Sequence, residues 1–111
     1  MNLNKAIIIG RIIQYPRFLD SEERTPLLTF SVATNTIYHD KQLGRQEMAE
    51  FHNVKVRGKM ASSLSKLLTK SMLVMVEGEY RCREWQDKGE KRREHYIHAD
   101  RIQFHRPKVE Q

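Results

Sequence analysis

The sequence predicts a mainly β fold: a five-stranded barrel with one short helix between strands 3 and 4. Several stretches have the apolar alternation or the β-rich composition of strands. One stretch spaces its leucines as an amphipathic helix does. The first predicted strand contains Gly10, at which a small barrel can bend. The 111-residue chain has room for one domain, predicted over residues 1–105 and followed by a short polar tail at 106–111.

The first predicted strand is Leu3–Ile13, an apolar run that ends at Tyr15. Arg17–Pro26 is polar and acidic, so we expect a loop there. The second predicted strand, Leu27–Asn35, alternates with period two. Its side chains expected on one side are Leu28, Phe30, Val32 and Thr34.

The long polar segment Thr36–Glu50 is expected to be a hairpin tip or a disordered loop. The third predicted strand, Phe51–Arg57, has two distinct faces. One face carries Val54 and Val56 together with His52. The other face combines an aromatic ring with cations and consists of Phe51, Asn53, Lys55 and Arg57.

The segment Lys59–Lys70 is predicted to form the helix, because its large apolar residues recur at helical spacing. These residues are Met60, Leu64, Leu67 and Leu68.

The fourth predicted strand, Leu73–Trp85, also presents two faces. The apolar face, suited to a core, holds Val74, Val76, Tyr80 and Cys82. Cys82 is the single cysteine, so we expect a small core residue. The exposed face places two guanidinium groups and an indole in one row and consists of Glu79, Arg81, Arg83 and Trp85.

A charged turn is expected at Gln86–Arg93, followed by a last strand around Glu94–Phe104. The predicted order is three strands, a helix and two strands. That order, with the bend at Gly10, matches the oligonucleotide-binding (OB) barrel.

The composition favours a polyanionic partner, since the formal net charge is +6. No apolar run has membrane-spanning length, and the N-terminus lacks a secretory signal pattern. We therefore expect a cytoplasmic protein that does not contact membranes. His95 and His98 would point to opposite faces of a strand, so no metal site is predicted. No cofactor loop or catalytic constellation is present either, and we expect no enzyme.

The two faces that combine cations with aromatic rings are typical of surfaces that bind single nucleic-acid strands. Arginine and lysine contact phosphates, and a flat ring stacks on an unpaired base. A charged face that is merely solvated is the alternative for either strand alone. The combination of cations with an aromatic ring recurs on two separate strands, and this recurrence favours nucleic-acid binding.

The chain also resembles the bacterial single-stranded DNA-binding protein family over residues 3–104. The motifs occur in the family order with near-family spacing. They are NKAIIIGR at Asn4–Arg11, FSVAT at Phe30–Thr34, YHDK at Tyr38–Lys41, EFH at Glu50–His52, GK at Gly58–Lys59, VEG at Val76–Gly78 and RCREW at Arg81–Trp85.

The resemblance implies an OB-fold protein that binds unpaired DNA in replication, repair and recombination, usually as a homotetramer. The family's stacking aromatics fall on Tyr38, Phe51 and Trp85. The cations expected to contact phosphates are Lys5, Arg11, Lys55, Arg57, Lys59, Arg81 and Arg83. Loop cations that would widen this path are Lys41, Arg45, Lys88, Lys91, Arg92 and Arg93.

The chain departs from the family pattern at several places. Arg57 stands where relatives commonly have an aromatic residue, and Met75 where they often have Tyr. Arg17–Pro26 lacks the usual Gly-containing turn. The chain stops at Gln111 without the Gly/Pro/Gln-rich linker and acidic tip that recruit partner enzymes. Whether that absence is natural or reflects a shortened chain stays open.

Several alternatives remain open at this stage. A primosomal or plasmid-type OB protein is one, and an OB module that binds a protein partner is another. RNA binding is a third, because base stacking does not distinguish the sugars. A dimer fits the composition as well as the family's tetramer does. A nucleoid-associated location would follow from DNA binding.

Overall fold

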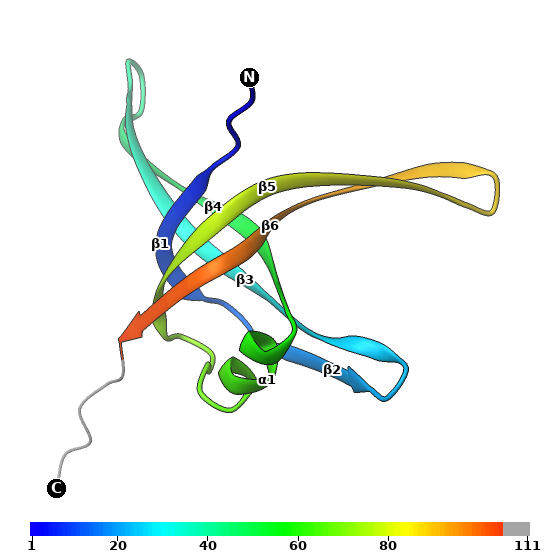
Figure 1. Ribbon diagram of the computed structural model, residues 1–111. Helices are drawn as coiled ribbons and strands as arrows, with labels where there is room; N and C mark the ends of the chain where they lie inside the picture. The colour runs from blue at the N-terminus through cyan, green and yellow to red at the C-terminus, as the bar shows by residue number, and fades with distance from the viewer. Residues whose placement is uncertain (106–111) are drawn as a thin grey trace, which may run out of the picture.

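A computed structural model describes residues 1–105. The predicted polar tail at 106–111 lies outside the described residues. Figure 1 shows a small barrel from which hairpins extend. The elements, in chain order, are β1 (Ala6–Ile12), β2 (Arg17–Ser21), β3 (Arg24–Asp40), β4 (Gly44–Arg57), α1 (Lys59–Ser65), β5 (Leu73–Asp87) and β6 (Glu90–His105).

The barrel closes through five strands in the order β1, β5, β6, β4 and β3, with β3 pairing back to β1. The pairing of β4 with β6 is parallel, and the other pairings are antiparallel. The helix lies between the third and fourth barrel strands. The predicted five-stranded barrel with one short helix is therefore confirmed.

The core follows the alternation of the strands. Leu28, Val32, Val54 and Val56 are almost completely buried, and so are Val74 and Val76. Each such side chain contributes about 1.5–3 kcal/mol when it leaves water. The predicted inward faces of these three strands are thus confirmed within the barrel.

Gly10 marks the point where β1 crosses β3 to close the barrel. A Cβ atom at this position would lie 2.2 Å from the backbone oxygen of Ala33. Just beyond it, Arg11 and Ile12 pair with Ala33 and Val32. The close approach of the two backbones explains why the strand has a glycine here.

The helix is shorter than the sequence predicts, because α1 ends at Ser65 rather than near Lys70. After it, the chain turns so that Leu68 and Met72 are buried beside the strands. The backbone N–H of Ser71 then donates to the carbonyl of Ile12 at 2.7 Å, which directs the chain into β5. No helix within residues 1–105 is long and apolar enough to cross a membrane.

The prediction of a loop at Arg17–Pro26 is wrong, because β2 and the start of β3 form a short hairpin there. Phe18 and Leu19 pair with Leu28 and Leu27, and the acidic residues gather around the turn. The cross-strand apolar contacts explain why a strand forms in a polar segment.

The segment Thr36–Glu50 is a hairpin, one of the two expected alternatives. β3 and β4 remain paired as far as Asp40 and Gly44. The charged turn expected at Gln86–Arg93 is wrong in extent, because only Lys88 and Gly89 form it. Both ladders therefore continue beyond the barrel as paired arms (Figure 1).

Tyr80 and Cys82 do not belong to the core, which corrects the prediction. The ladder between β5 and β6 shifts register between Glu77, which pairs with Arg101, and Gly78, which pairs with Ala99. Beyond that irregularity β5 enters the arm, where Tyr80 stacks on His95 instead of packing into the core. Tyr80 is consequently 51% exposed, and Cys82 is exposed.

Candidate nucleic-acid interface

The outer side of β4, β5 and β6 carries a connected group of charged and aromatic side chains. Cross-strand pairing places Arg83 opposite Glu94 and Trp85 opposite Arg92. Lys55 of β4 lies beside the same strands, because the parallel ladder pairs it with His98. Residues directly opposite one another share a face, so these side chains point outward together.

Lys55 is the most enclosed cation of this group, with 12% of its side chain exposed. Its Nζ atom lies 3.0 Å from a Glu94 carboxylate oxygen. The same ammonium group is 4.5 Å from the centre of the Tyr96 ring. The carboxylate and the ring face together hold Lys55 in position.

Arg83 contacts the same carboxylate from the arm. Its guanidinium is 3.3 Å from Glu94 Oε2 and lies over the Trp85 ring, 4.5 Å from the ring centre. Trp85 remains 39% exposed. The arrangement therefore offers an accessible indole beside two cations.

Two adjoining grooves run along this surface, with volumes of about 500 and 830 Å³. Lys55 and Arg83 line both of them. The first groove also contains Glu94, and the second contains Arg57. Continuous grooves lined by cations suit an extended polyanion.

Tyr15, Arg17 and Arg24 also line these grooves, although they were not among the predicted site residues. Tyr15 is 76% exposed. The hairpin of β2 and β3 brings the arginines to the groove, and that hairpin was expected to be an acidic loop. The basic residues at both ends of the acidic segment were the available signal.

Phe51 lies farther along β4 on the face that also holds Asn53 and Lys55. It is 65% exposed, unusual for a large aromatic ring. Asn53, between them on this face, accepts a hydrogen bond from the hydroxyl of Ser31 at 2.9 Å. An exposed ring on a rigid central strand can stack on a base.

Tyr38 is separated from Phe51 by the geometry of their ladder. Phe51 pairs with Ala33, whereas Tyr38 pairs with Gln46 on the part of the hairpin that forms the arm. Because side chains alternate, Tyr38 lies on the opposite face of this ribbon from Phe51. Tyr38 is 47% exposed.

Arg57 and Arg81 lie on either side of His98. Burial is the main cause that lowers the pKa of His98 below its usual value, and the positive charges of Arg81 and Arg57 lower it further. Arg81 also pairs with Glu79 at 3.1 Å. Arg57, Arg81 and Lys55 thus place three cations around His98, on the strands that flank β6.

The remaining predicted phosphate contacts lie elsewhere. Lys5, just before β1, pairs with Glu77 of β5 at 2.6 Å, and the paired carboxylate raises the pKa of Lys5. Arg11 donates to the carbonyl of Ser71 at 3.0 Å. Lys59 is exposed at the start of α1. Of these cations, none lines the two grooves formed by the described residues.

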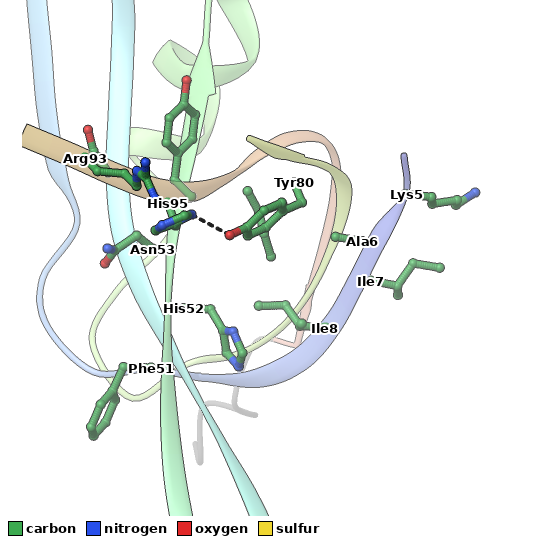
Figure 2. Close-up of a pocket in the computed structure, with 13 residues that line it drawn as sticks. Lys5, Ala6, Ile7, Ile8, Phe51, His52, Asn53, Tyr80, Arg93 and His95 are labelled. Carbon is green, nitrogen blue, oxygen red and sulfur yellow. Dashed lines mark hydrogen bonds between the residues drawn. The ribbon is translucent and has the colours of Figure 1, made fainter. Parts of the chain in front are cut away.

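A separate pocket of about 760 Å³ lies between β1, β4 and the base of the arm formed by β5 and β6. Figure 2 shows Tyr80 and His95 meeting there, with the Tyr80 hydroxyl 2.5 Å from His95 Nδ1. His52, also in this pocket, is 2.8 Å from the hydroxyl of Thr34. Lys5 and Phe51 line the same pocket.

Within residues 1–105, no group of three or more His, Cys, Asp and Glu side chains is placed to hold a metal ion. His95 and His98 lie opposite Cys82 and Glu79, respectively, so they occupy different faces of the ribbon, as predicted.

The barrel topology with its single helix defines an OB-fold protein. The sequence matches the profile of the single-strand binding protein family over residues 3–105. A single-stranded DNA-binding protein of Aquifex aeolicus is 35% identical, and the match covers 96% of this chain and 73% of that protein. Single-stranded DNA-binding protein 1 of Xylella fastidiosa is 36% identical over 93% of this chain and 77% of that protein.

An SSB from Plasmodium falciparum, solved in complex with single-stranded DNA, has a similar fold. Its TM-score is 0.86 at 23% sequence identity, with coverage of 96% of this chain and 97% of that chain. Together with the profile match, these similarities establish the family. The chain belongs to the single-strand binding protein family.

Proposed function

We propose that this protein binds single-stranded DNA without regard to sequence and protects it during replication, repair and recombination. The observation that carries the proposal is the pair of grooves lined by Lys55 and Arg83, of which Arg83 lies over the exposed indole of Trp85. Family membership supports the same ligand, since related proteins are named for it. The protein acts by binding, without catalysis, at DNA in the cytoplasm.

The bases stack on Tyr38, Phe51 and Trp85. Each stacked base contributes about 1–3 kcal/mol, and every base has a face that can stack. Trp85 lies under Arg83, which lines both grooves, and Phe51 lies farther along the outer face of β4 from Lys55, at the separate pocket. Tyr38 contacts the DNA strand from the arm formed by β3 and β4. Such contacts give affinity with little preference among bases.

The phosphates follow the cations of β4 and β5. Lys55, Arg57 and Arg83 line the central part of this path, and Tyr15, Arg17 and Arg24 extend it along the β2–β3 hairpin. Arg81 lies outside the grooves on the same face of β5 as Arg83 and adds positive charge beside them. Lys5, Arg11 and Lys59 contact DNA only where the strand passes beyond the grooves. Affinity should fall steeply as the salt concentration rises, because binding releases the counterions that are condensed on the DNA phosphates.

The test is a titration of the protein with oligo-dT, followed by Trp85 fluorescence. Trp85 is the only tryptophan, so the signal reports this site alone. Strong quenching by oligo-dT and weak quenching by duplex DNA of equal phosphate count would support base stacking. Equal responses to both, abolished by salt, would contradict it and leave only a basic surface. An oligo-rU titration measures the preference for DNA over RNA.

The protein assembles as a homo-oligomer, with a tetramer favoured over a dimer. Ile7 and Ile9 of β1 are 55% and 61% exposed, and they lie beside Met75 and Leu73 of β5. In addition, β1 pairs with β3 only through Arg11 and Ile12, which leaves most of that edge available. An exposed apolar face beside an open strand edge favours association.

Light scattering with size-exclusion chromatography tests this assembly. Ile9→Lys should reduce the molecular mass of the assembly, because it places a charge in the apolar face. Ile37→Lys is the matched control, since Ile37 is 49% exposed on the arm formed by β3 and β4, away from this face. Equal masses for the wild-type protein and Ile9→Lys would rule out this face as the interface.

A further inference from the structure

We propose that Glu94 occupies the position of a DNA phosphate in the free protein, so that binding exchanges its carboxylate for the nucleic acid. This inference rests on the proposed function, and it concerns how the site is held before DNA arrives. It assigns Glu94 a competing role, opposite to that of the cations around it.

The contacts of Glu94 are those that a bound phosphate would make. Lys55 Nζ lies 3.0 Å from Glu94 Oε1 and donates to Oε2 at 3.1 Å, and the Arg83 guanidinium lies 3.3 Å from the same Oε2. The two cations come from different strands, β4 and β5. Lysine and arginine bind carboxylates and phosphates through the same charge-assisted hydrogen bonds. The carboxylate thus bridges two strands at the centre of the interface.

Glu94 is also placed in the path of the ligand. It lines the first groove together with Lys55 and Arg83. Only 26% of its side chain is exposed, so its charge is incompletely screened by water. A phosphate entering this groove meets both the carboxylate and cations that are already neutralised. Binding must separate these ion pairs before the cations can contact DNA.

The carboxylate further controls access to Trp85. Arg83, which it holds at 3.3 Å, lies over the indole ring at 4.5 Å from its centre. A guanidinium over the ring covers one of the two faces on which a base could stack. Release of Arg83 from Glu94 therefore frees a phosphate ligand and a stacking surface in the same step.

Glu84 provides a matched control on the same arm. It pairs with Arg93 across the ladder, and its position puts it on the face opposite Arg83. Its side chain is 56% exposed, and it does not line either groove among the described residues. Glu84→Gln and Glu94→Gln change the net charge equally. A difference between their DNA affinities therefore reports the effect of where the carboxylate lies, separate from the effect of net charge.

The experiment measures oligo-dT affinity by fluorescence anisotropy of labelled DNA over a range of salt concentrations. We expect Glu94→Gln to bind about three- to tenfold more tightly at low salt, because the freed cations contact phosphate without a competitor. The salt slope should steepen by about 0.7 for each phosphate gained. Glu84→Gln should bind as the wild-type protein does. Trp85 emission in the free protein should change only in Glu94→Gln, as Arg83 leaves the ring.

Three results would overturn the inference. Equal affinities and slopes for Glu94→Gln and Glu84→Gln would show that only net charge matters. Weaker binding by Glu94→Gln would show that the carboxylate positions the cations for DNA. Failure of the wild-type protein to bind oligo-dT would overturn the proposed function, and this inference with it. Thermal unfolding checks the fold of each variant, and Glu94→Thr, which suits a strand, is a second neutral substitution.

Discussion

The Arg83 guanidinium lies over the Trp85 ring, 4.5 Å from its centre, two positions apart on one face of β5. The strand alternation places both side chains on the outer surface, and the ion pair with Glu94 orients the guanidinium. A phosphate contact and a base contact are therefore adjacent. This spacing matches the chemistry of a single strand, in which phosphates and unpaired bases are both accessible.

Replacing Trp85 with Ala should weaken oligo-dT binding about tenfold or more, because a stacking surface is lost. Trp85→Phe should keep most of the affinity, since it retains an aromatic face. The measurement is fluorescence anisotropy of labelled DNA, with circular dichroism to check the fold. If Trp85→Ala and Trp85→Phe bind equally well, stacking at this position contributes nothing.

Phe51→Ala should cause a loss of similar size, again about tenfold. Phe51 is 65% exposed, so its removal leaves the core intact and the free energy of unfolding should hardly change. The affinity is measured as for Trp85, and urea unfolding measures the stability. Unchanged affinity would place the DNA away from this part of β4.

Joint replacement of Arg81 and Arg83 with Ala should reduce the salt dependence of binding. Each phosphate contact contributes about 0.7 to the slope of log K against log salt for a single strand. Arg101→Ala is the control, because Arg101 lies near Glu77, outside both grooves of the described chain. A slope unaltered by the double variant but reduced by Arg101→Ala would move the DNA path to β1 and the adjoining strands.

The barrel was predictable because apolar and polar residues alternate clearly in strands that have the core on one side and the outer surface on the other. Val54 and Val56 face the core while Lys55 lies on the outer face, so their positions follow from the pattern alone. The exposed row of Arg83 and Trp85 was predictable for the same reason. These residues needed no knowledge of which strands are neighbours.

The arms and the β2 hairpin were less predictable, because their structure depends on pairing with distant residues. Tyr80 and Cys82 continue an apolar pattern past the end of the barrel, where no core remains to cover them. The contact of Glu94 with Lys55 joins residues 39 positions apart. Periodicity within one strand cannot reveal such a contact.

His98 should couple protons to stability and to binding in opposite directions. Its pKa is lowered by burial and by Arg81 and Arg57, against the opposing effects of Glu79 and Asp100. The unfolded chain therefore binds more protons than the folded protein below about pH 6.5, the usual value for His. The stability contributed by neutral His98 is complete above that pH and is lost as the pH falls through the lowered pKa.

Phosphates that neutralise Arg81 and Arg57 should raise the pKa of His98, so DNA affinity should increase on acidification below about pH 6.5. Both effects should be smaller in His98→Gln, measured by urea unfolding and by anisotropy between pH 5.5 and pH 8 (roughly the range in which His titrates). Identical pH profiles for His98→Gln and the wild-type protein would assign the effect to the other histidines.

Gly10→Ala should destabilise the barrel by about 2–4 kcal/mol, because the added Cβ meets the backbone of Ala33 and that strand pairing cannot shift without opening the closure. Gly44→Ala is the control. It meets no atom within 4 Å, but its φ of +76° makes the change cost about 1–3 kcal/mol through backbone strain alone. Urea unfolding measures the free energy of unfolding of both variants.

Hydrogen exchange distinguishes the two variants. Gly10→Ala should accelerate exchange at the backbone amides of Ile12 and Ile13, whereas Gly44→Ala should affect only the arm formed by β3 and β4. Uniform protection in both variants would show that β1 closes the barrel without needing glycine at this crossing.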